Sequence, residues 1–84
     1  MKDDALIIAG YIEQNPHYPG LDAARVKGYG VSVWSIIAYL HSVGGDVAQV
    51  ATDYALPRQA VEAAVAYYRR HKSLIDARIA ANAA

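Results

Sequence analysis

Basic and amide side chains that could contact DNA gather in one stretch of this 84-residue chain. Arg58 and Gln59 follow Pro57 at the start of a predicted helix, where a guanidinium can read guanine and an amide can read adenine. Three bases further along can contact phosphates without reading sequence: Arg69, Arg70 and Lys72. The residue types and their spacing therefore predict a DNA-binding surface of five side chains, with Glu62 as an opposing acid.

Two predicted helices in the segment DVAQVATDYALPRQAVEAAVAYYRR, residues 46–70, would position this surface. A helix-turn-helix needs a small residue where the helices cross, a sharp turn, and apolar residues that fix the angle between the helices. Ala51 suits the crossing, Ala55 begins the turn, and Val61 anchors the second helix. The outward residues at the start of the second helix are predicted to be Arg58, Gln59, Glu62 and Ala63. The alternative is a helical hairpin that only packs a core, because small and apolar residues abound in a sequence that is 55% hydrophobic.

The first 31 residues are predicted to contain a short strand and a hairpin. The isoleucine-rich segment ALIIAGYIEQ favours a strand, although a short helix capped by Asp3 or Asp4 is the alternative. In ARVKGYGVSV, two apolar pieces flank a turn in which Gly28 and Gly30 permit positive φ.

Helices are predicted for the rest of the chain, residues 32–84. One runs from Ser32 or Val33 to Val43 and is ended by two glycines, and Asp46 caps the next. The fold class is thus mainly α: a single small domain with an N-terminal strand and hairpin, then a helix-turn-helix-type three-helix core with a long C-terminal helix.

The last helix raises the question of what covers it. If it runs unbroken from Pro57 to about Asn82, it is roughly 39 Å long at 1.5 Å per residue, so something outside the domain should pack on its end. A break is the alternative, because Ser73 followed by Asp76 resembles a capping box. Either way, we expect an apolar partner-binding surface formed by Leu74, Ile75 and Ile79.

The charge distribution is more informative than the net charge of zero. Residues 1–56 carry three bases and six acids, net −3, whereas residues 57–84 carry five bases and two acids, net +3. A basic C-terminal third could bind DNA weakly as a monomer and usefully as a dimer, and the small domain itself favours a homodimer. The alternative is that these are ordinary solvated helix charges.

Other chemistry is not expected. The chain has no cysteine, and His17, His41 and His71 lie on separate elements, so we predict no metal site and no cofactor. No serine has the motif of a nucleophile, so we expect no catalytic residue and no enzyme activity. No apolar run is long enough to span a membrane, and the acidic start differs from a secretory signal, so we expect a cytoplasmic protein.

The order of these segments resembles domain-of-unknown-function family 433, small proteins grouped with VapB-type antitoxins. The resemblance covers about Tyr11 to Ile79 and rests on the segments RVKGYGV, VATDY and AVEAAVAYYRRH. It implies a winged or simple helix-turn-helix core, a homodimer, operator DNA as a ligand and a toxin as a partner.

One departure from the family concerns the hairpin. The family commonly has Gly-Thr-Arg-Ile where this chain has Gly28, Tyr29, Gly30 and Val31. The arginine is missing, so any contact that it makes in relatives is absent here, and Arg25 and Lys27 are the nearest bases. A protein-protein interaction module without DNA contact is therefore the competing hypothesis.

Overall fold

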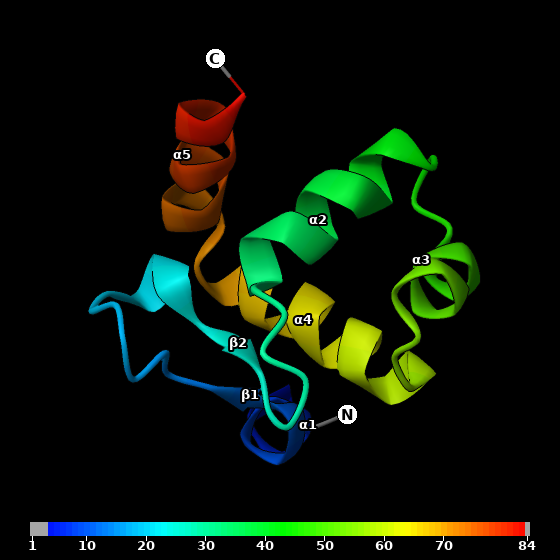
Figure 1. The fold of residues 1–84 in the computed structure, drawn as a ribbon, viewed down its shortest axis with the longest axis horizontal. Coiled ribbons are helices and arrows are strands. Elements are labelled where there is room, and N and C mark those ends of the chain that lie inside the picture. The colour runs from blue at the N-terminus through cyan, green and yellow to red at the C-terminus, as the bar shows by residue number, and fades with distance from the viewer. Residues whose placement is uncertain (1–3, 84) are drawn as a thin grey trace.

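The computed structural model describes residues 4–83, and these are mainly helical, as predicted (Figure 1). In chain order the elements are α1 (Asp4–Tyr11), β1 (Ile12–Glu13), the 3-10 helix η1 (Leu21–Ala23), β2 (Arg25–Val26), α2 (Val33–Ser42), α3 (Val47–Tyr54), α4 (Arg58–Arg70) and α5 (Lys72–Asn82). No helix among the described residues has the length and apolar character needed to cross a membrane.

The segment predicted as an N-terminal strand is mostly the helix α1, and the strand is confirmed only at Ile12 and Glu13. The helix beginning near Asp4, the stated alternative, is the one that forms, while Asp3 lies outside the described residues. Lys27, which is distant in sequence, binds the C-terminal end of α1. Its Nζ donates to the Ala9 carbonyl at 2.5 Å, and its backbone N–H donates to the Tyr11 carbonyl at 2.8 Å. Tertiary contacts outweigh the strand preference of the isoleucines.

A two-residue antiparallel pairing joins β1 to β2, with Ile12 opposite Val26 and Glu13 opposite Arg25. The Arg25 Nε donates to the Glu13 carboxylate at 2.8 Å across the strands. Ile12 and Val26 are buried, so this small sheet closes one side of the core.

The turn predicted at KGYG is present between β2 and α2. The backbone N–H of Val26 donates to the Val31 carbonyl at 2.8 Å, and an isolated bridge pairs Arg25 with Ser32. Gly28 and Gly30 both have positive φ, 78° and 72°, as a tight reversal requires.

Helix α2 supplies one face of the hydrophobic core, and its bounds agree with the prediction to within one residue. The four residues at helical spacing on that face are all buried: Val33, Ile36, Ile37 and Leu40. They pack with Val50 of α3, Val61 of α4 and Ile75 of α5. After α2, Gly44 has a φ of 68° and Gly45 donates to the Leu40 carbonyl at 2.9 Å, which is the glycine-rich helix end expected there.

The predicted long C-terminal helix is two helices, α4 and α5, which meet at His71. At φ −130° and ψ 38°, His71 leaves the helical region and the chain turns steeply (Figure 1). The alternative of a break is therefore correct, but its site lies two residues before Ser73. The Asp76 carboxylate accepts from Lys72 Nζ at 2.6 Å and from Tyr68 Oη at 2.7 Å, so it does not serve a capping box.

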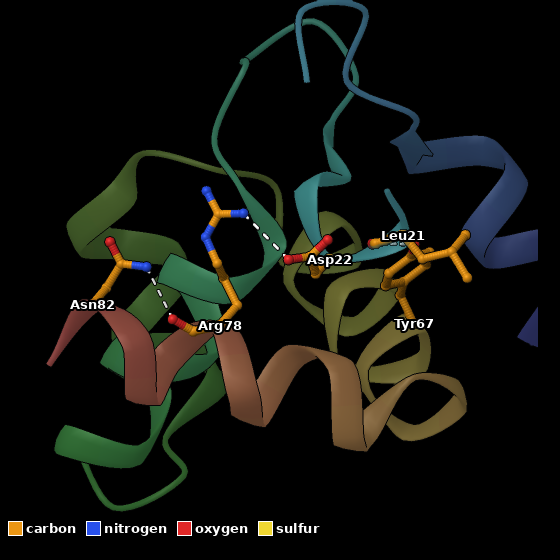
Figure 2. A network of polar contacts seen from close by, with 5 residues as sticks. All are labelled: Leu21, Asp22, Tyr67, Arg78 and Asn82. Atoms are coloured by element: carbon orange, nitrogen blue, oxygen red, sulfur yellow. Dashed lines mark hydrogen bonds and ion pairs between the residues drawn. The ribbon is translucent and has the colours of Figure 1, made fainter. Parts of the chain in front are cut away.

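The break lets α5 pack on α2 and η1 within a body of 33 × 26 × 25 Å, which a straight helix of roughly 39 Å would exceed. No outside cover is therefore needed for its inner face. Figure 2 shows the residues of two contacts that hold η1 against the last two helices, and we call these two contacts the clasp. Tyr67 Oη of α4 donates to the Leu21 carbonyl at 2.6 Å, and Arg78 Nη1 of α5 donates to Asp22 Oδ2 at 3.3 Å. The Arg78 guanidinium also lies 5.6 Å from the ring centroid of Trp34.

Candidate nucleic-acid interface

Helices α3 and α4 have the predicted helix-turn-helix order, with a turn of three residues between them. Asp46 caps α3, since its carboxylate accepts from the Gln49 N–H at 3.0 Å. Ala55 ends α3 in the left-handed region, at φ 55° and ψ 45°. The next residue, Leu56, is buried and donates its N–H to the Ala51 carbonyl at 2.9 Å, so the turn is fixed from below.

At the start of α4, Arg58 and Gln59 are exposed, as a base-contacting pair must be. The Arg58 Nε lies 3.1 Å from the Glu62 carboxylate in an i,i+4 ion pair, with 61% of the arginine side chain exposed. Such an exposed pair is weak, so it leaves the guanidinium free to exchange partners. The prediction for Ala63 is wrong, because α1 packs on α4 and this residue is completely buried.

The exposed residues of α4 lie on one side of the helix. At 3.6 residues per turn they fall within a sector of about 120°, and they span roughly 18 Å of helix: Arg58, Gln59, Glu62, Arg69 and Arg70. All five predicted DNA-binding residues are exposed, and four of them share this sector. Within the described chain, neither Arg69 nor Arg70 forms an ion pair or a side-chain hydrogen bond.

The turn between α4 and α5 forms a second basic feature. An open crevice of about 360 Å³ is lined by six consecutive residues: Arg69, Arg70, His71, Lys72, Ser73 and Leu74. The Lys72 ammonium is held by Asp76, which raises the pKa of the lysine and lowers the pKa of the aspartate. Asp76 also raises the pKa of the Tyr68 hydroxyl, because that hydroxyl donates to the carboxylate. Lys72 therefore remains charged but is partly neutralised by its neighbour.

A groove of about 330 Å³ lies on the outer side of α4 beside Glu62, and no sequence pattern predicted it. Its lining comes from three helices: Asp4 and Ile7 of α1, Val47 of α3, and Glu62, Val65, Ala66 and Arg69 of α4. A strand in place of α1 would not have formed this wall, which is why the groove escaped prediction.

The predicted apolar partner surface on α5 is smaller than expected. Ile75 is fully buried between α5 and the core, so it is unavailable to a partner. Leu74 is 47% exposed and Ile79 is partly exposed, and these two residues remain.

The bases of the hairpin are engaged within the domain. Arg25 pairs with Glu13, and Lys27 holds the end of α1. Tyr29, between the two glycines of the turn, is 52% exposed.

Several tyrosine hydroxyls form hydrogen bonds within the domain. The Tyr39 hydroxyl donates to Asp53, which also accepts from Gln49, and these bonds raise the pKa of Tyr39 and lower that of Asp53. Burial raises the pKa of Tyr67, whose hydroxyl belongs to the clasp. Residues 4–83 contain no group of three or more histidine, aspartate or glutamate side chains that could hold a metal ion.

Comparison with known proteins gives one match. The model of the family described as protein of unknown function (DUF433) matches residues 22–68, more than half of the chain. No curated protein and no solved structure matches the chain. The matched residues begin in η1 and end in α4, so they include β2, α2, α3 and the turn that sets the exposed side of α4. The chain therefore belongs to the DUF433 family.

Proposed function

We propose that this protein is a helix-turn-helix regulator of antitoxin type, which binds operator DNA as a homodimer and pairs with a toxin. The observation that carries the proposal is the exposed side of α4, where Arg58 and Gln59 stand at the free start of the second helix. In DNA-binding helix-turn-helix proteins, the first residues of this helix contact base edges in the major groove.

The bases at the far end of α4 would fix its position on DNA. Arg69, Arg70 and Lys72 lie one helix length from Arg58, and neither arginine forms an ion pair among the described residues. Three phosphate contacts per protomer make about six in a dimer, which corresponds to a salt slope near −5 on logarithmic axes. A monomer would give half that slope, so salt dependence reports the number of protomers bound.

The toxin-binding surface is proposed on α5. Leu74 is 47% exposed and Ile79 is partly exposed, so apolar area of α5 remains accessible on either side of the buried Ile75. The antitoxin part of the proposal rests on the family resemblance together with this surface.

A matched pair of variants tests the DNA contact. Arg58→Gln and Glu62→Gln each break the same ion pair with a residue that favours helices, so their structural effects are alike. Their effects on DNA should be opposite, since one removes a base and the other an acid from the same side of α4. In gel-shift titrations with the gene's own upstream DNA at two salt concentrations, we expect Arg58→Gln to weaken binding about tenfold and Glu62→Gln to strengthen it.

Equal changes in both variants, or no salt-sensitive binding at micromolar protein, would refute the DNA contact. A second candidate, a protein-interaction module without DNA contact, is favoured by the groove, because a recess with apolar residues and two acids in its lining suits a protein segment better than a phosphate backbone. Pull-down of a toxin from nuclease-treated extract, combined with a negative gel shift, would support that candidate.

A further inference from the structure

The outer face of α1 is apolar and has no cover from the rest of the described chain. Leu6, Ala9 and Gly10 are exposed, and Leu6 is 72% exposed, the highest value among the large hydrophobic residues described. No residue of α1 is fully buried, although every residue after Asp4 is apolar, glycine or tyrosine. A solvated helix ordinarily carries polar side chains on its outer face, so this face is suited to contact with another surface.

Gly10 has no structural role within the domain. It has no positive φ, and a Cβ added there would meet nothing within 4 Å. Glycine inside a helix is destabilising relative to alanine, so neither backbone geometry nor internal packing explains this residue. Close approach of another backbone from outside would explain it. Leu6 precedes Gly10 by four residues, so the two are neighbours on the helix surface.

The apolar face continues into the groove on α4. Ile7 lines the groove and is a neighbour of Gly10 at i,i+3 spacing, so Leu6, Ile7 and Gly10 form one continuous surface. An eight-residue helix is only about 12 Å long, too short to supply the roughly 800 Å² per partner of a standard interface. The groove supplies further area beside it.

We propose that two copies of this chain pair through the outer face of α1 and the adjoining groove. The charges beside the groove favour a second copy over a strongly charged partner. Asp4 and Glu62 are acidic and Arg69 is basic, so a twofold arrangement can place acid against base between the copies. The side chains on the apolar face of α1 carry no charge and can pack against their own symmetry mates, with the Lys27 ammonium at the end of the face, on the Ala9 carbonyl.

This inference specifies the homodimer of the proposed function and shares Glu62 and Arg69 with its DNA-binding surface, but its tests use Leu6 and Gly10, which lie outside that surface. Sedimentation equilibrium of the full chain without DNA tests it. We expect dimers at tens of micromolar, with Leu6→Gln weakening dimerisation about tenfold or more through loss of a buried leucine on each side. Leu74→Gln is the matched control, because it removes an exposed leucine from α5 and should leave the dimer unchanged.

Gly10→Ala gives a second, opposite readout. It should weaken the dimer about tenfold, yet raise the melting temperature of the dilute monomer by about 4 °C, because alanine favours the helix. Circular dichroism would verify that each variant keeps its helix content.

A wild-type monomer at 100 µM protein would overturn the inference, as would equal effects of Leu6→Gln and Leu74→Gln, or a Gly10→Ala dimer as strong as the wild type. DNA binding by a monomeric wild type would overturn this inference and leave the DNA contact standing. A dimeric wild type that does not bind DNA in the gel shift would refute the DNA contact and leave this inference standing.

Discussion

Helices α1 and α4 pack against each other, yet they bury their apolar residues very differently. Helix α4 buries six of its thirteen residues and places its charges on the opposite side, whereas α1 is apolar nearly throughout and fully buries none. The contrast between the faces of a helix, more than its total hydrophobicity, fixes how that helix sits on a core. A helix without contrast can pack in several orientations, and it leaves apolar surface for a partner.

From this comparison, we predict the largest change in the free energy of unfolding for a substitution in the core. Ile36 of α2 is fully buried among residues of α3 and α4, so Ile36→Ala should lower the free energy of unfolding by about 3 kcal/mol. Leu6→Ala in α1 should change it by less than about 0.5 kcal/mol when the protein is dilute enough to be monomeric. Urea titration measures both. A Leu6→Ala loss as large as that of Ile36→Ala would show that α1 belongs to the core.

The same contrast explains what the sequence could predict. Val33, Ile36, Ile37 and Leu40 recur on one face of an amphipathic helix, so their burial and the bounds of α2 were predicted correctly. In ALIIAGYIEQ the apolar residues are nearly continuous, and no period distinguishes a helix from a strand. The distant contacts of Lys27 stabilise the helix, and local sequence does not contain them.

The candidate site was predicted to a similar extent. The exposure of Arg58, Gln59, Arg69, Arg70 and Lys72 followed from spacing along α4 and its extension, and it is confirmed. The burial of Ala63 and Ile75 depends on which helix packs beside them, α1 in one case and the folded-back α5 in the other. Neither packing partner is evident from the sequence. The segment of α1 was predicted mainly as a strand, and no glycine or proline marks the break at His71 that lets α5 fold back.

A smaller effect is predicted at the turn of the helix-turn-helix. Ala55 has a φ of 55°, where a side chain is strained and glycine is not, so Ala55→Gly should raise the free energy of unfolding by about 1 kcal/mol. Ala48→Gly, at an exposed position inside α3, should lower it by about 1 kcal/mol. Thermal melting of the two variants gives opposite shifts if the turn in solution has this geometry. Two decreases would contradict it.

The smallest change in stability is predicted outside the core, where Lys72 and Tyr68 donate hydrogen bonds to the Asp76 carboxylate. Their hydrogen bonds lower the pKa of Asp76 below its ordinary value of 3.8. The folded chain therefore takes up this proton less readily than the unfolded chain, so the stabilisation is complete above pH 3.8 and is lost as the pH falls through the lowered pKa. We expect the melting temperature of Asp76→Asn to lie slightly below that of the wild type at pH 6 and to approach it near pH 2.

The control for this pH effect is Lys72→Gln, which removes the main cause of the lowered pKa. In that background, Asp76→Asn should have less influence on the pH dependence. A difference between wild type and Asp76→Asn that stays constant from pH 6 to pH 2 would show that the carboxylate is not held in this way.

The clasp in Figure 2 also has a consequence for the order of folding. Its two bonds join residues 46 and 56 positions apart, Tyr67 with Leu21 and Arg78 with Asp22, whereas the turn between α3 and α4 closes through residues five apart. Closing a longer loop costs more chain entropy, so contacts of this kind form slowly. We expect the pair of helices α3 and α4 to form early, and the contacts of α4 and α5 with η1 to form only when the rest of the chain has already collapsed.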